Sequence, residues 1–164
     1  MARPAKVGKR GSVLVIHENR GLNPHIKDVT RRMALEGFNA MALDFLSPLG
    51  GTPDNEDEAR ALFSKLDRAQ TAENGLSALA ELNARPEANG RMGTVGFCWG
   101  GGMVNQMAVY APTLDAAVCF YGVAPNTALV PQIKARVMLH YAGVDERINA
   151  GRSAYEAALK SAGV

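Results

Sequence analysis

Cys98 stands in a segment whose residue types and spacing suit nucleophilic chemistry. The segment reads Gly-Phe-Cys-Trp-Gly from Gly96 to Gly100 and follows a short β-branched run, while residues 103–110 are expected to form a helix. Such a strand–turn–helix elbow strains the backbone of its central residue, and glycines two positions away leave room for the close chain crossing. The thiol would lie at a helix N-terminus, where unpaired N–H groups and the helix dipole favour the nucleophilic thiolate.

A buried, inert cysteine is the main alternative, because free cysteine is among the most often buried residues. Cys119, within an expected strand, fits that role, whereas the glycines that flank Cys98 favour the elbow. A phosphate-binding Walker loop is excluded because Gly102 stands where that motif requires lysine. No Gly-x-Gly-x-x-Gly pattern opens a helix, so the sequence lacks a dinucleotide-binding fingerprint.

Strand and helix patterns alternate along the chain. Apolar runs without polar alternation are typical of strands covered on both faces. The expected strands are residues 12–17, 38–43, 92–97, 115–121 and 136–141, and the expected helices are residues 24–36, 55–66, 68–84, 103–110 and 152–161. The expected loops are residues 47–53, 125–131 and 142–149. This alternation predicts an α/β fold, with a doubly wound, mostly parallel sheet and helices on both faces.

Five polar or reactive residues lie at the carboxyl ends of the five expected strands. They are Glu18, Asp44, Cys98, Tyr121 and Asp145. In open α/β sheets, ligands bind in the crevice beyond these strand ends. The sequence therefore predicts one functional site at this edge of the sheet.

A cysteine nucleophile needs a base, and a carboxylate normally orients that base. In α/β hydrolases the nucleophile, the acid and the histidine follow one another in that order. Asp145 stands where the acid belongs, although a turn or capping role is the alternative. No histidine follows it: His17 and His140 end expected strands and are candidates for core histidines, and His25 is expected to be solvated.

Two backbone N–H groups are candidates for an oxyanion hole. One belongs to Trp99, the residue after the nucleophile, and the other comes from the loop after the first strand, around Asn19. Glu18 beside this hole is unusual for an anion-stabilising site. It could hydrogen-bond the thiol in the resting state, and an outward salt bridge with Arg20 or a neighbouring residue is the alternative.

The 164 residues suit a single domain. We expect residues 1–10, with two Lys and two Arg, to form a flexible tail rather than a signal peptide. At net charge +2 the basic residues are interspersed with acidic ones, which argues against nucleic-acid binding, and no run approaches the ~18 apolar residues of a membrane span. Two cysteines 21 positions apart fit neither a disulfide framework nor a metal site, so a cytoplasmic location is expected.

Four segments, in order, resemble the dienelactone hydrolase (carboxymethylenebutenolidase) family. They are residues 15–24, 96–102, 120–122 and 140–149, within a match that runs from residue 11 to residue 164. The resemblance implies an α/β-hydrolase fold and hydrolysis of small-molecule lactones or esters through a thioester, without a cofactor. By the same resemblance Cys98 matches the nucleophile and Asp145 the triad acid.

The resemblance assigns further roles. Glu18 matches the glutamate that receives the thiol proton, and Asn19 and Trp99 match the oxyanion-hole residues. Arg60 matches a substrate-carboxylate arginine in a looser alignment, and Tyr121 is a further substrate-binding candidate.

The family's histidine lies in a segment after one more strand, which this sequence does not contain. Family members usually carry further strands before the position of residue 12 as well. We therefore expect a partial hydrolase domain over residues 1–164, truncated at both ends, with the sheet incomplete at the C-terminal end and turnover impaired. An exposed sheet edge would favour a homodimer. The alternatives are a non-catalytic fragment and a flavodoxin-like reactive-thiol protein, either a redox sensor or glutaminase-like.

Overall fold

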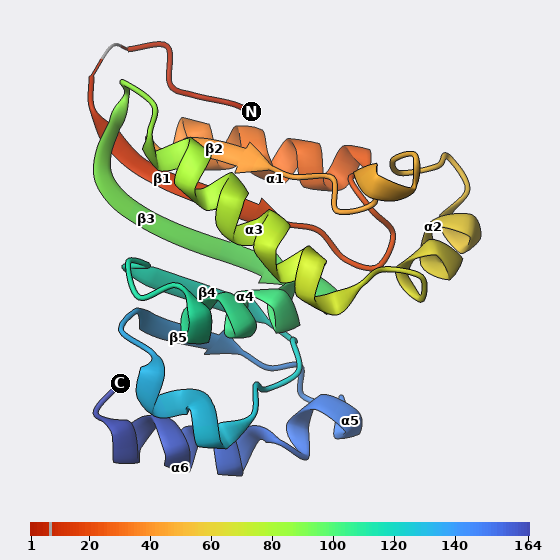
Figure 1. Cartoon of the computed structure of the whole chain (residues 1–164), viewed down its shortest axis with the longest axis vertical. Helices are drawn as coiled ribbons and strands as arrows, with labels where there is room; N and C mark the ends of the chain where they lie inside the picture. The colour runs from red at the N-terminus through yellow and green to blue at the C-terminus, as the bar shows by residue number, and fades with distance from the viewer. Residues whose placement is uncertain (7) are drawn as a thin grey trace.

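A parallel five-stranded sheet forms the centre of the computed structural model, which describes residues 1–6 and 8–164. The strands are β1 (Arg10–Ile16), β2 (Asn39–Ala42), β3 (Ala88–Phe97), β4 (Ala116–Phe120) and β5 (Arg136–His140). Their order across the sheet is β2-β1-β3-β4-β5, and every neighbouring pair is parallel (Figure 1). The predicted α/β fold with a doubly wound sheet is confirmed.

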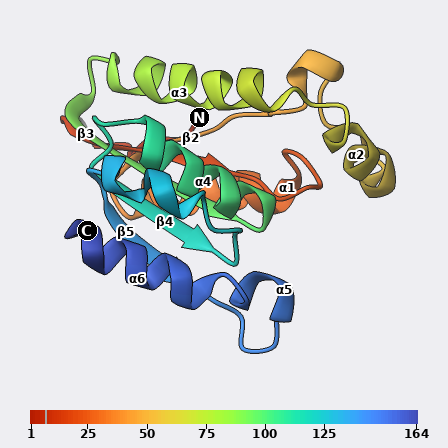
Figure 2. The same ribbon diagram turned by 60° about the horizontal axis from the view of Figure 1, so that its bottom comes forward.

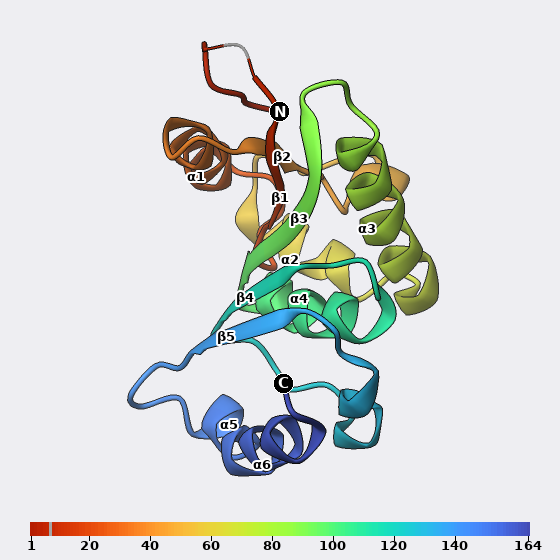
Figure 3. The ribbon, with the colours of Figure 1, turned by 90° about the vertical axis from the view of Figure 1, so that its left-hand side faces the viewer.

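Helices cover both faces of this sheet. They are α1 (Pro24–Leu35), α2 (Glu56–Phe63), α3 (Arg68–Asn83), α4 (Trp99–Tyr110), α5 (Glu146–Asn149) and α6 (Arg152–Ala162), with short 3₁₀ helices η1 (Ser47–Leu49) and η2 (Thr127–Gln132). Figure 3 shows α1 on one side of the sheet and α3 and α4 on the other. Within the part of the chain that the structure describes, none of the helices has both the length and the apolar character needed to cross a bilayer.

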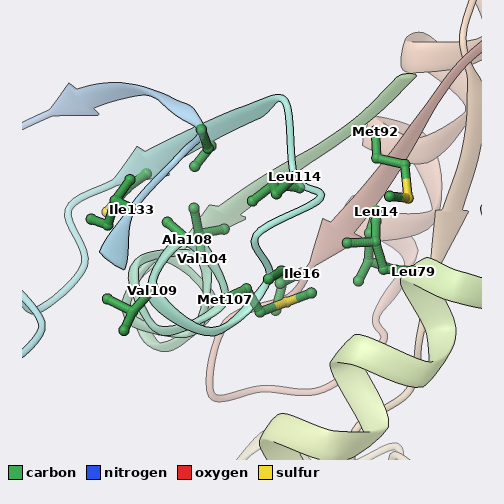
Figure 4. Close-up of a cluster of buried hydrophobic side chains, with 14 of the residues drawn as sticks. Leu14, Ile16, Leu79, Met92, Val104, Met107, Ala108, Val109, Leu114 and Ile133 are labelled. Atoms are coloured by element: carbon green, nitrogen blue, oxygen red, sulfur yellow. The ribbon is translucent and has the colours of Figure 1, made fainter. Parts of the chain in front are cut away.

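The larger hydrophobic core lies on the face covered by α3, α4 and α6. Leu14 and Ile16 of β1 belong to it together with Leu79 of α3 and Met107 of α4, and Figure 4 shows this part of the cluster. These four side chains are 0–3% exposed, and full burial of such a side chain contributes about 1.5–3 kcal/mol. This packing fixes α4, and with it the elbow, against the sheet.

The opposite face is less completely covered. Val15, Ile26 and Val95 form a smaller cluster beneath α1. Farther along the sheet, Met138 of β5 is 56% exposed and His140 is also exposed. The expectation that His140 is a core histidine is therefore wrong, because no helix of the described chain covers this part of the sheet.

Several boundaries differ from the sequence-based expectation. Strand β3 begins at Ala88 rather than at residue 92, and the expected loop 47–53 contains η1. Helix α4 begins at Trp99 rather than at residue 103, because its first-turn glycines are helical and closely packed. The expected loops 125–131 and 142–149 contain η2 and α5. Both short helices begin at a side-chain cap, which periodicity does not reveal.

The N-terminal segment contacts the sheet. Ala2 forms an antiparallel bridge with Ala40, Arg3 pairs with Glu87, and Arg10 is the first residue of β1. These contacts hold Ala2, Arg3 and Arg10 against the sheet. The flexibility of residues 1–10 as a whole stays a prediction.

Candidate functional site

The backbone of Cys98 has the strained conformation that the elbow requires. Its φ of 53° and ψ of −114° lie in a region that side-chain-bearing residues rarely adopt. The Cys98 N–H donates to the Phe120 carbonyl at 3.0 Å, and α4 begins at the next residue. The partly buried thiol therefore stands between the end of β3 and the N-terminus of a twelve-residue helix.

Glycines make this crossing of the chain sterically feasible. A Cβ on Gly96 would lie 2.3 Å from the Gly100 carbonyl oxygen. A Cβ on Gly100 would lie 2.4 Å from the Ile16 oxygen and 2.5 Å from the His17 oxygen. Gly100 thus lets the first turn of α4 touch the backbone at the end of β1, which brings the loop after β1 close to the elbow.

Cys98→Gly is expected to unfold at a higher temperature than Cys98→Ala. Both variants lose the thiol, but only glycine adopts a φ of 53° without strain. Relief of about 1–3 kcal/mol of strain, less about 0.4–1 kcal/mol for the entropy of unfolded glycine, leaves a net gain of about 0.5–2 kcal/mol. Calorimetry should show a Tm difference of about 2–6 °C. A Cys98→Gly variant that melts no higher than Cys98→Ala would show that the elbow stores no strain.

The two predicted oxyanion-hole donors lie on either side of this close contact. Trp99 is the first residue of α4, and Asn19 lies in the loop that follows β1. Among the described residues, the N–H groups of Asn19 and Trp99 have no acceptor within the protein. Two unpaired N–H groups beside a nucleophile can stabilise an oxyanion.

The Glu18 side chain lies beside Tyr121, at the end of β4. The Tyr121 hydroxyl donates to Glu18 Oε1 at 3.2 Å. Burial raises the pKa of Tyr121 to about 12, with further contributions from the Glu18 carboxylate and the Cys98 thiol. The phenol therefore remains a hydrogen-bond donor at neutral pH. Arg20 pairs instead with Glu56 at 2.7 Å, so the alternative salt bridge between Glu18 and Arg20 is not formed.

Tyr121 has a positive φ of 40°, the second such value for a non-glycine residue among the described part of the chain. Its N–H donates to the His140 carbonyl at 2.8 Å, and a Cβ on the next residue, Gly122, would lie 2.2 Å from the Gly101 carbonyl carbon. The end of β4 thus packs directly on α4, which holds Tyr121 near the elbow.

His17 is fully buried, as the sequence predicts, and both ring nitrogens are occupied. Nδ1 lies 2.7 Å from the Glu18 carbonyl oxygen, and Nε2 accepts from the Phe45 N–H at 3.1 Å. Burial lowers the pKa of His17, against smaller opposing effects of the Glu18 carbonyl and Asp44. His17 is therefore neutral at pH 7 and has no lone pair available for the Cys98 thiol.

The other two histidines also lie away from the thiol. The rings of Phe97, Phe120 and His140 stack across β3, β4 and β5, with centroid distances of 5.0 and 4.2 Å, and His25 contacts Phe97 edge-on. This aromatic row lies on the α1 side of the sheet. In the described part of the chain, no histidine contacts Cys98 or Asp145 through a hydrogen bond.

Asp145 follows β5 and caps α5. Its Oδ1 accepts from the Ile148 N–H at 3.1 Å, so the capping role weighed from the sequence is present. Figure 1 and Figure 2 show α5 and α2 at the same edge of the sheet, the edge at which the strands end. The position of Asp145 is compatible with a triad acid, and that role stays a prediction.

Arg60 lies on α2 and pairs with Asp57 at 3.5 Å. Its side chain is 50% exposed, and within the described chain it forms no hydrogen bond or ion pair with the other candidate site residues. The structure therefore does not bring Arg60 to the thiol, and its substrate-binding role stays a prediction.

A network that the sequence does not reveal joins the loops after β1 and β2. Asp44 accepts from the N–H and the hydroxyl of Thr52, both at 2.8 Å, and the Thr52 hydroxyl accepts from the Leu22 N–H at 2.7 Å. Asp44 thus holds the two loops together. The sequence predicts a loop over residues 47–53, but it does not indicate that Thr52 bonds to Asp44 and Leu22.

Aromatic side chains surround the indole of Trp99. His17 stacks on it at a centroid distance of 5.7 Å, and Phe45 and Phe63 pack edge-on at 5.3 and 4.8 Å. The first residue of α4 is thus held by side chains from three places: the loop after β1, the loop after β2, and α2. Spacing along the sequence did not predict the contribution of Phe45 or Phe63.

Two hollows of the surface lie outside this site. One, of about 270 Å³, is lined by the N-terminal segment and Glu87, and the other, of about 460 Å³, lies between η2 and α6. Among the described residues, no three His, Cys, Asp or Glu side chains gather in a way that could hold a metal ion. The elbow and its two N–H donors are therefore the arrangement best suited to covalent chemistry.

The whole chain matches a family model. The model describes the dienelactone hydrolase family, and the match covers residues 1–164. A protein of Methylorubrum extorquens named "Putative carboxymethylenebutenolidase" is 34% identical over 161 residues, which are 90% of this chain and 55% of that relative. The chain thus spans little more than half the length of this relative.

Solved structures share the same arrangement of strands and helices. A crystal structure from Klebsiella pneumoniae described as "Putative Dienelactone Hydrolase" has a TM-score of 0.86 at 29% identity, over 99% of this chain and 74% of that one. The acylaminoacyl peptidase of Pyrococcus horikoshii, at 18% identity, has a TM-score of 0.70 over 98% of this chain and 32% of its own, and shows the shared fold alone. The elbow, the sheet order and the family match together establish that this chain belongs to the dienelactone hydrolase family and has an α/β-hydrolase fold.

Proposed function

We propose that this chain acts on small-molecule esters or lactones through an acyl-thioester on Cys98. The observation that carries the proposal is the strained elbow, with φ 53°, beside the N–H groups of Asn19 and Trp99. The family match supports hydrolysis as the reaction class. A preformed pair of donors stabilises charge that develops on a carbonyl oxygen, and loss of one such donor typically costs about 10²–10³ in rate.

The reaction begins when the Cys98 sulfur attacks the carbonyl carbon. A carbon–sulfur bond forms, the carbonyl electron pair moves to oxygen, and the resulting oxyanion accepts from the two N–H groups. The Glu18 carboxylate takes the thiol proton, and the Tyr121 hydroxyl donates to one of its oxygens. The tetrahedral intermediate then collapses, the carbon–oxygen bond breaks, and the leaving alkoxide takes up the proton that Glu18 received from the thiol. With a lactone, the leaving alkoxide remains attached to the acyl chain.

Hydrolysis of the thioester is the slower half of the proposed reaction. Water must attack the acyl carbon, and a general base typically accelerates such a step about 10²–10⁴-fold. His17 is engaged through both ring nitrogens, and His25 and His140 contact the aromatic row on the α1 side of the sheet. We infer that this chain acylates readily and deacylates slowly.

The intact mass of the protein after incubation with p-nitrophenyl acetate tests the proposal. We expect a gain of one acetyl group on Cys98, together with a burst of nitrophenol, and neither in Cys98→Ala. Continuous release without an adduct, abolished in Cys98→Ala, would show that deacylation is fast in this chain. Absence of both adduct and release, in a protein that is still alkylated at Cys98, would contradict the proposal and favour a non-catalytic fragment or a reactive-thiol protein.

Four further assignments stay predictions. Arg60 and Tyr121 are proposed to contact the substrate, Arg60 through a substrate carboxylate. Self-association as a homodimer is proposed because β5 forms one edge of the sheet and its Met138 is 56% exposed. A cytoplasmic location is proposed from the two free thiols.

A further inference from the structure

His17 makes three contacts, two of which reach the loop and the helix that carry the oxyanion-hole donors. Nδ1 lies 2.7 Å from the carbonyl oxygen of Glu18, and Nε2 lies 3.1 Å from the nitrogen of Phe45. The ring also stacks on Trp99 at 5.7 Å with an interplanar angle of 17°. With 0% exposure, the imidazole has no alternative partner in solvent.

We propose that His17 is a positioning residue that aims the N–H of Asn19 into the oxyanion hole by holding the Glu18 carbonyl. The inference rests on the proposed function, because the hole matters only if a carbonyl is attacked. His17 does not itself touch the substrate.

The hydrogen bonds determine which ring nitrogen carries the proton. The Glu18 carbonyl can only accept, so Nδ1 must be the donor, and the Phe45 N–H can only donate, so Nε2 must be the acceptor. Asp44 Oδ1 lies 4.0 Å from Nε2, too far for a hydrogen bond. One tautomer of the neutral ring satisfies both contacts, and a protonated ring would place an N–H against the Phe45 N–H.

The orientation of the Glu18 carbonyl also determines the orientation of the Asn19 N–H. The carbonyl of Glu18 and the N–H of Asn19 belong to the same planar trans peptide, so they point in opposite directions. A bond that holds the carbonyl toward His17 therefore fixes the N–H on the other side of the peptide plane. The Gly21 N–H also donates to the Glu18 carbonyl, at 3.3 Å, so without the shorter His17 bond only this longer contact orients the peptide and its N–H toward the developing oxyanion.

Other contacts make His17 an effective anchor. Phe45, which holds Nε2, is 1% exposed and belongs to the main core. The far end of the same loop is tied down where the Leu22 N–H donates to the Thr52 hydroxyl at 2.7 Å. The loop is thus held at both ends, and the Glu18–Asn19 peptide lies next to the His17 attachment.

Packing alone is the competing explanation, because a buried aromatic ring stabilises the core whether or not it holds a peptide. A matched pair of variants separates the two roles. In His17→Asn the side-chain amide nitrogen takes the place of Nδ1 and can still donate to the Glu18 carbonyl. In His17→Gln the amide reaches the place of Nε2, keeps the Phe45 contact and loses the Glu18 contact. Both variants lose the same imidazole ring.

The experiment measures two reactions of Cys98 in the same proteins. Acetylation by p-nitrophenyl acetate passes through an oxyanion, whereas alkylation by iodoacetamide is a direct displacement at saturated carbon. We expect the acetylation rate constant at saturating ester to be about 10–100-fold lower in His17→Gln than in His17→Asn. This is less than the effect of about 10²–10³-fold expected when one donor is lost completely. The two variants should have the same half-saturating ester concentration and the same alkylation rate within about twofold, because neither quantity depends on the oxyanion.

Equal acetylation rates in the two variants would overturn the inference, and so would an equal loss in acetylation and alkylation. If the wild-type protein is alkylated at Cys98 but never acetylated, the proposed function itself fails. Should neither variant fold, the ¹⁵N chemical shifts of histidine-labelled wild-type protein still show which ring nitrogen of His17 carries the proton. A proton on Nδ1 of His17 is expected at neutral pH, and a proton on Nε2 would contradict the positioning role.

Discussion

Imidazole in the buffer is expected to convert a single acetyl-transfer burst into continuous hydrolysis of p-nitrophenyl acetate. The chain has three histidines, of which His17 is engaged through both ring nitrogens and His25 and His140 lie against the aromatic row. Within the described chain, water therefore lacks a histidine base at the thioester. A small imidazole molecule can reach the partly buried Cys98 and supply one.

A general base contributes about 10²–10⁴-fold to such steps, and an unanchored one contributes less, so we expect a rise of at least about 10-fold in steady-state release. The burst amplitude should remain near one equivalent. The same imidazole concentration with Cys98→Ala gives the uncatalysed background, which is subtracted. Turnover that is already rapid without imidazole, and insensitive to it, would show that a group of the chain itself, such as Glu18, serves as the base for deacylation.

Gly100→Ala is expected to abolish most acylation of Cys98 and to destabilise the fold. The added methyl group would lie 2.4 Å from the Ile16 oxygen and 2.5 Å from the His17 oxygen. Both are backbone atoms, so no side-chain rotation can relieve the contact, and α4 must move away from the end of β1. The N–H groups of Trp99 and Asn19 then separate, and acetylation should fall by about 10²–10³-fold.

The expected loss of stability is about 1–3 kcal/mol, typical of overpacking, even though alanine is the better helix former. Chemical denaturation measures the stability and the nitrophenol burst measures acylation. Gly143→Ala is the matched control, because a Cβ at Gly143 meets nothing within 4 Å and should leave both quantities unchanged. A Gly100→Ala protein with normal stability and a normal burst would show that this contact does not set the geometry of the hole.

Sequence patterns predicted the elements of this fold to within a few residues. Continuous apolar runs located all five strands, and the Asn-Pro pair located the start of α1, where Asn23 accepts from the Ile26 N–H at 3.1 Å. The glycines around Cys98 predicted the positive φ that the structure contains. These features were predictable because each depends on residues that are neighbours along the chain.

The contacts between loops were not predictable in this way. His17 meets Phe45, 28 positions later, and Glu18 meets Tyr121, 103 positions later. The burial of His140 depends on which element covers β5. In the structure the His140 side chain is exposed and stacks on Phe120. Apolar periodicity reports that a residue lies on a strand, but it does not report which element lies above that strand.

Local residue types thus decided the strands, the helices and the strained turn at Cys98, because glycine content, apolar runs and capping residues act over a few positions. The tertiary structure decided which polar atoms meet. It occupied both nitrogens of His17, paired Arg20 with Glu56 and brought Tyr121 to Glu18. Hydrogen bonds of this kind depend on distances of about 3 Å between groups that are remote in the sequence, and only the packing of α4 and the loops against the sheet sets those distances.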